Sequence, residues 1–94
     1  MAKKLNKIAG RCEEIALMSG TITPNSSAQP LFYDISRHWR ALQTATSFRT
    51  ADGEWNEKEI LAADLMIATL GYLNRIGCKD IERLLNDRMN RQLQ

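Results

Sequence analysis

The strongest constraint on the fold is an apolar segment between residues 60 and 76. Its hydrophobic side chains are Ile60, Leu61, Ala62, Ala63, Leu65, Met66, Ile67, Ala68, Leu70, Tyr72, Leu73 and Ile76. On a helix they point to nearly every side, a pattern typical of a helix that other helices surround. Asp64 interrupts the run, so the segment is not expected to span a membrane. We therefore predict a central, buried helix over residues 57–76.

Both ends of this helix carry boundary signals. Asn56 can cap the first turn while the Glu59 side chain, three residues on, bonds back to it. Trp55 and Ile60 occupy the two positions of a hydrophobic staple. Gly77 suits the left-handed backbone conformation that ends many helices. These signals make this helix the best defined element of the chain.

Three further helices are expected, over residues 5–19, 31–46 and 81–92, because apolar residues recur there at helical spacing. Residues 21–30 contain both prolines and several small polar residues, which is typical of a loop. Residues 50–53 have the composition of a turn. No alternating strand pattern and no internal repeat is present.

The predicted fold class is all-α, a four-helix bundle in a single domain of residues 1–94. A chain of 94 residues buries only a modest share of its surface, and its central helix is very apolar. We therefore expect a homo-oligomer that completes the bundle.

Charge and cysteine usage exclude several classes of function. Thirteen basic and 11 acidic residues leave a net charge of +2. This balance does not favour a nucleic-acid or membrane-surface partner. Cys12, Cys78 and the lone His38 do not form a zinc site. We expect reduced thiols, no signal peptide and a cytoplasmic location.

Asp64 needs an explanation, because it interrupts the most apolar helix. A buried carboxylate without a partner costs several kcal/mol or takes up a proton. Three interpretations are open. Asp64 could meet an arginine such as Arg37 or Arg40, face solvent on a polar stripe with Glu57, or bind a metal ion.

Two stretches of the chain resemble a known family. Residues 63–85 read ADLMIATLGYLNRIGCKDIERLL and are followed by Arg88-Met89-Asn90; residues 34–45 read DISRHWRALQTA. The first resembles the E-x-x-A-D helix, Gly-x-Asp turn and K-x-x-x-N-like end of the MazG-like, all-α NTP pyrophosphohydrolases. The second resembles that family's E-E-x-x-E-L-x-x-A helix. The resemblance covers roughly residues 31–91 and rests on spacing and helix order.

The resemblance implies Mg²⁺-dependent cleavage of an NTP or dNTP to a monophosphate and pyrophosphate. The family holds its metal with E-x-x-E and E-x-x-D carboxylates, since Mg²⁺ prefers oxygen ligands. In this chain the first pair falls on His38 and Ala41 and the second on Leu61 and Asp64. Of the four positions, only Asp64 keeps a carboxylate.

Two functions remain open. The missing carboxylates favour a catalytically degenerate MazG-like protein that binds a nucleotide, a nucleotide-derived ligand or a protein partner. The alternative is an active, Mg²⁺-dependent pyrophosphohydrolase with an atypical metal site. The nucleotide-binding or cleft candidates are Asp34, Arg37, His38 and Trp39, and the metal candidates are Asp64 and Glu57. The sequence assigns no catalytic residue, and the small size would suit a phage accessory protein.

Three side chains also have a purely structural interpretation. Trp39 lies on the main apolar stripe of its helix, where packing into the core is favoured over stacking on a base. Glu13 and Glu14 are expected on an exposed helix face.

Overall fold

The computed structural model describes residues 3–45 and 55–93. Its four helices are α1 over Lys4–Met18, α2 over Gln29–Thr44, α3 over Glu57–Arg75 and α4 over Ile81–Gln92. No strand occurs within the two described ranges, and the all-α prediction is confirmed. The expected helix bounds agree to within two residues. Residue 46 and the turn expected at residues 50–53 lie outside the described residues.

The boundary signals of α3 act as expected. The Asn56 side chain accepts a hydrogen bond from the Glu59 backbone N–H at 2.9 Å, and the Glu59 carboxylate accepts one from the Asn56 N–H at 3.0 Å. This reciprocal pair is a capping box. Gly77, two residues beyond α3, has a φ of +86°, and Gly20 after α1 has +82°. Both values lie in the left-handed region that favours glycine.

The core lies where α1 crosses α3. A Cβ added to Gly71 would lie 3.5 Å from the Cys12 carbonyl carbon, so the two backbones approach closely there. Ala16 of α1 and Ala68 of α3, which line the same cavity as Cys12 and Gly71, are also small and buried. Small side chains let two helices approach each other closely, and this fixes their crossing.

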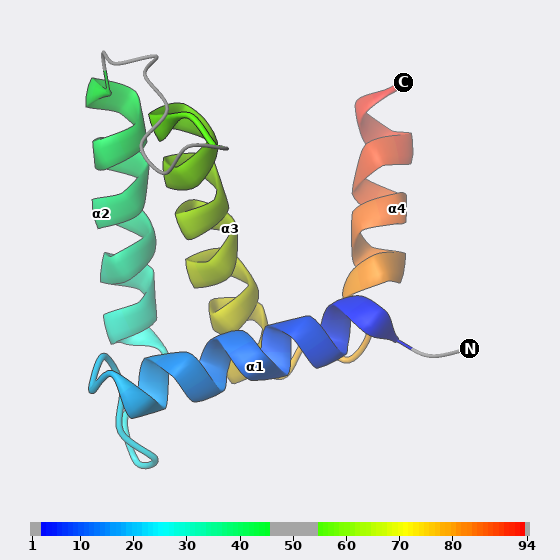
Figure 1. The fold of residues 1–94 in the computed structure, drawn as a ribbon. Helices are drawn as coiled ribbons and strands as arrows, with labels where there is room; N and C mark the ends of the chain where they lie inside the picture. The colour runs from blue at the N-terminus through cyan, green and yellow to red at the C-terminus, as the bar shows by residue number, and fades with distance from the viewer. Residues whose placement is uncertain (1–2, 46–54, 94) are drawn as a thin grey trace.

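Figure 1 shows α2 and α3 side by side, with α1 running across the foot of both. The loop after α1 places Ile22 beside Ala16, and Leu31 of α2 completes this buried cluster. α4 stands apart, at the other end of α1, and leaves a gap between itself and α3 in the ribbon.

The first turn of α4 is anchored to the start of α1. Ile81 is fully buried. The Asn6 side chain accepts a hydrogen bond from the Ile81 N–H at 2.9 Å and donates one to the Cys78 carbonyl at 3.0 Å. The Glu82 carboxylate accepts from the Leu5 N–H at 3.3 Å, a stabilising position for a negative charge at a helix N-terminus. Beyond this turn, residues 83–93 are all exposed.

The four helices do not close into a bundle in the single chain. Only Ala68 and Gly71 of α3 are buried, whereas Met66 is 62% exposed. The expectation that α3 is covered all round is therefore wrong for one copy. The physical reason is that α4, which should cover it, contacts α1 instead. The radius of gyration, 14.6 Å, exceeds the value of about 12.4 Å typical of a compact chain of this length.

Within the ranges described, none of the helices has the length and apolar character needed to cross a membrane.

Candidate functional site

Three of the four residues predicted for a cleft line one crevice. Asp34, Arg37 and His38 lie one helical turn apart on α2 and border a cavity of about 200 Å³ between α1, α2 and α3. Asp34 forms an ion pair with Arg37 through Oδ1, and its Oδ2 lies 3.5 Å from His38 Nε2. The sequence could place these residues together because steps of three and four share a helix face.

The remaining walls of this crevice are mainly apolar. They include Ile15 of α1, Leu31 of α2 and Ile67 of α3. Cys12 also lines it, and burial raises the pKa of its thiol although Arg11 acts in the opposite direction. A protonated thiol is a poor nucleophile. The crevice therefore offers an apolar floor with one polar rim.

The charges at this rim largely satisfy one another. The Asp34 carboxylate is half-buried and already paired with Arg37, whose side chain is 73% exposed. A carboxylate that is engaged by a guanidinium has less capacity for a cation. The cavity is also smaller than the roughly 300–1,000 Å³ of typical ligand pockets. The arrangement suits a small group with an apolar body better than a whole nucleoside triphosphate.

Trp39, the fourth cleft candidate, does not line this crevice. Its side chain is 53% exposed, so the interpretation that it packs into the core is wrong. Helix α2 buries only Leu31, in its first turn, and the later residues of its apolar stripe, Trp39 among them, are less covered. Its role in stacking on a base remains a prediction.

Asp64 lies at a separate recess of about 340 Å³ along α3, together with Trp55 and Ile60. Trp55 and Ile60 both line this recess, and their packing as a staple pair stays a prediction. The Asp64 side chain is half-buried. It forms no ion pair with Arg37 or Arg40 in the described structure, since Arg37 binds Asp34 instead. An ion pair with Arg37 or Arg40 is thus not formed within the described residues, and the solvent-facing and metal-binding interpretations stay predictions.

The second metal candidate, Glu57, lies seven residues before Asp64. Two helical turns separate their backbones by about 10.5 Å, whereas Mg²⁺ binds oxygen at about 2.0–2.1 Å. Across residues 3–45 and 55–93, no three His, Cys, Asp or Glu side chains come together as a metal-binding group. These two carboxylates do not by themselves fit a Mg²⁺ site, and their metal role remains a prediction.

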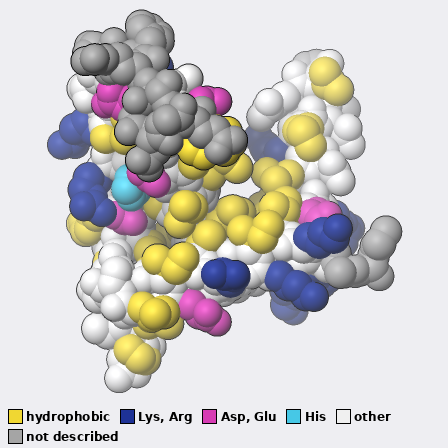
Figure 2. All heavy atoms as spheres, in the orientation of Figure 1, with side chains coloured by type: hydrophobic (Ala, Val, Ile, Leu, Met, Phe, Trp, Pro, Cys, Tyr) yellow, Lys and Arg dark blue, Asp and Glu magenta, His cyan; other side chains and the backbone are white. Residues whose placement is uncertain are grey.

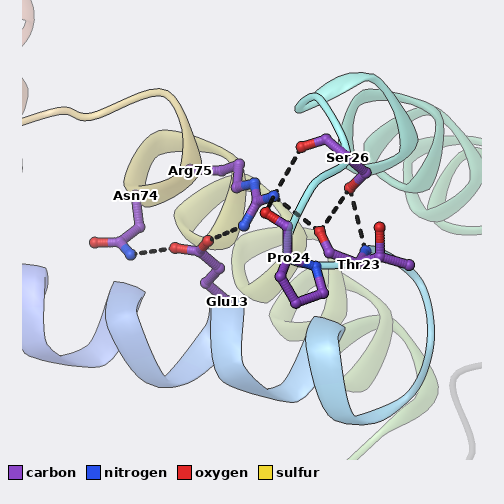
Figure 3. Close-up of polar contacts among 6 residues, drawn as sticks. All are labelled: Glu13, Thr23, Pro24, Ser26, Asn74 and Arg75. Atoms are coloured by element: carbon purple, nitrogen blue, oxygen red, sulfur yellow. Dashed lines mark hydrogen bonds and ion pairs between the residues drawn. The ribbon is translucent and has the colours of Figure 1, made fainter.

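A polar cluster at the end of α3 was missed by the sequence analysis. Arg75 Nη1 donates to Glu13 Oε2 at 2.8 Å, and Asn74 donates to the other carboxylate oxygen (Figure 3). Glu13 is half-buried, so the expectation that it lies on an exposed face is wrong. The hydrogen bond from Arg75 is the main cause that lowers the pKa of Glu13, and Asn74 adds to it against the opposing effect of burial.

Arg75 also fixes the loop between α1 and α2. Its Nη2 donates to the backbone carbonyls of Thr23, Pro24 and Ser26 at 2.7–3.0 Å (Figure 3). One guanidinium thus joins α1, α3 and the loop, because arginine presents five N–H donors in a rigid planar fork. Glu13 and Arg75 lie 62 positions apart, and neither residue has a local pattern that signals the pairing. The cluster is structural, because the charged groups of Glu13 and Arg75 bind each other and their neighbours within it.

The largest unexplained feature of the surface is apolar. Figure 2 shows a hollow between α4 and the α2–α3 pair, with hydrophobic side chains gathered over α1, α3 and the lower part of α4. Exposed apolar residues on these three helices include Ile8, Ile15, Met66, Ile67, Leu84, Leu85 and Met89. Apolar patches that continue over several elements usually mark interaction sites. We call the exposed apolar residues on these three helices the open face.

Comparisons with protein-family models, with curated proteins and with solved structures found no match to this chain. The described residues alone therefore characterise the protein, as an all-helical chain with an open apolar face. The resemblance to the MazG-like hydrolases stays a prediction.

Proposed function

We propose that this protein is a non-catalytic helical module that binds a protein partner through the open face. The proposal rests on the exposed apolar face of α4. No other element of the described chain covers Leu84, Leu85 and Met89. A helix of 12 residues is marginal in water unless its apolar face packs against something. A partner that covers the open face would supply that packing.

The few carboxylates at the family's metal-binding positions are consistent with a catalytic centre that has lost its activity. A triphosphate needs a metal that offsets its charge, and such a metal needs several oxygen ligands. Of the four family positions only Asp64 is acidic, and Asp34 is paired with Arg37. The proposal therefore keeps the MazG-like ancestry as the origin of the scaffold and not as the present activity.

The crevice supports a second candidate function, the binding of a small or nucleotide-derived ligand. Three side chains predicted for a cleft from the sequence do share this cavity. Incubation with NTPs and dNTPs in Mg²⁺ or Mn²⁺ tests both this candidate and the active-enzyme alternative. Formation of monophosphate and pyrophosphate that disappears in Asp64→Ala would overturn the non-catalytic proposal. A melting temperature raised by a nucleotide without product would favour ligand binding, and His38→Ala should abolish that shift.

Amide hydrogen exchange of α4 at high dilution tests the main proposal. Residues 85–93 should exchange fast, because only the first turn of α4 is anchored. The first turns of α1 and α4 provide the internal comparison. Slow exchange along all of α4 in a monomeric sample would show that α4 packs within its own chain, and the proposal would fail.

A reducing, cytoplasm-like location is part of this proposal. Cys12 and Cys78 are both free thiols, and Cys12 is buried at the α1–α3 crossing. Oxidising compartments favour disulfides in small domains.

A further inference from the structure

We infer that the partner is a second copy of this chain, and that the two copies exchange their α4 helices. In this arrangement α4 of each protomer lies in the hollow between α3 and α4 of the other. The inference rests on the proposed function, because it names the occupant of the open face.

The first argument is the construction of α4. Ile81, Leu84, Leu85 and Met89 follow one another at steps of three, one and four residues, so they share one helix face. Ile81 is buried on α1, whereas the exposed fraction rises from 37% at Leu84 to 53% at Met89. The stripe that starts in the core thus continues into the hollow without a covering element.

The second argument is that the base of α4 is held in place. The two hydrogen bonds of Asn6 and the bond between Glu82 and the Leu5 N–H fix the first turn. An element that is anchored at one end and uncovered along the rest presents its apolar face in a defined direction. Preorganisation of this kind lowers the entropic cost of association.

The third argument is area. The accessible surface of the chain is 7203 Å², whereas a folded monomer of this mass exposes about 5,500 Å². The excess is at most about 1,700 Å², because residues outside the described ranges contribute to it, and this upper bound leaves room for the roughly 1,000 Å² or more that one subunit covers in an obligate dimer. A single small ligand would cover only a fraction of that area.

The fourth argument is self-complementarity. Figure 2 shows the hollow between α4 and the α2–α3 pair, and α3 and α4 both carry exposed apolar residues such as Met66 and Met89. A two-fold axis that brings α4 of a partner into this hollow carries α4 of the first copy into the partner's hollow. Two α3 and two α4 helices then form one four-helix core. The same contact covers the side of α3 that the single chain leaves open.

The mass of the full chain in solution, measured by sedimentation equilibrium over a wide concentration range, tests the inference. Met89→Glu places a charge on the stripe, and Asn90→Glu places the same charge on the opposite face of α4. The wild-type chain and Asn90→Glu should be dimers. Met89→Glu should weaken the dimer by about a hundredfold, because the symmetry buries the charge twice. The melting temperature of the wild-type chain should rise with concentration, a second readout that needs no variant.

Each other outcome overturns the inference. If the wild-type chain is monomeric and its melting temperature does not depend on concentration, the partner is not a second copy of this chain. If Met89→Glu still forms dimers, the interface lies elsewhere. If Met89→Glu and Asn90→Glu weaken the dimer equally, the apolar stripe of α4 does not form the interface. Fast exchange of α4 in a monomer would leave the proposed function standing with another protein as the partner. Slow exchange of α4 in a monomer would contradict both the exchange of α4 helices and the proposed partner-binding function.

Discussion

Arg75 and Glu13 join the end of α3 to the middle of α1 through a 2.8 Å ion pair between half-buried side chains. The pair links two helices that lie far apart in the sequence and ties the loop after α1 to both of them. A pair with few solvent contacts is costly to break from one side, since the remaining charge loses its partner.

Arg75→Met should therefore lower the free energy of unfolding by about 2–4 kcal/mol. The variant leaves Glu13 half-buried without its guanidinium and frees three backbone carbonyls. Urea denaturation measures the loss. Arg91→Met is the matched control, because Arg91 forms only an exposed pair with Asp87 on α4, and it should change stability by less than about 0.5 kcal/mol.

The same pair predicts a dependence of stability on pH. The pKa of Glu13 is lowered in the folded state, chiefly by the hydrogen bond from Arg75. Its contribution to stability is then fully present above the unfolded carboxyl pKa of about 4.3 and is lost as the pH falls through the lower folded value. Urea midpoints of the wild-type chain and Glu13→Gln should converge as the pH is lowered through this window. A constant difference between them would contradict the assignment.

Gly71 is expected to tolerate alanine and to reject larger side chains. The added Cβ would meet Cys12 at 3.5 Å, an ordinary contact, while alanine favours the helix by up to about 1 kcal/mol. Gly71→Ala should thus be neutral or stabilising. Gly71→Leu should push α1 from α3 and cost at least about 1–3 kcal/mol. Thermal melts of both variants test this, and similar melting temperatures would argue against the close crossing.

Asn6 is expected to control the position of α4. Asn6→Ala removes two hydrogen bonds to the chain around Ile81 and leaves their half-buried partners unpaired, at a cost of about 1–3 kcal/mol. Hydrogen exchange should speed up in residues 78–84 of the variant. Asn90→Ala is the control, because it changes an exposed asparagine of α4. Unchanged exchange in Asn6→Ala would show that Ile81 alone holds the helix.

The sequence predicted the local structure well, since caps and periodicity are local properties. The capping box of Asn56 and Glu59 and the left-handed Gly77 could be identified from neighbouring residues alone. The grouping of Asp34, Arg37 and His38 followed from helical spacing, although the walls that make their crevice come from other helices.

Long-range relationships could not be predicted in the same way. The pairing of Glu13 with Arg75 depends on how α1 crosses α3, and this crossing is set by small residues such as Gly71. The position of α4 depends on Asn6, whose amide has no pattern that reveals its partner at residue 81. A hydrophobic pattern shows that α4 buries one face, and it does not show against which chain.

The most direct test of the central claim is a search for contacts of the Met89 methyl group by NMR, in a mixture of isotope-labelled and unlabelled full-length chains. The account predicts intermolecular nuclear Overhauser effects between Met89 of one copy and apolar side chains of α3 or α4 in the other. Effects that join Met89 to α3 only within one chain would show that α4 closes on its own protomer, and the account would be contradicted.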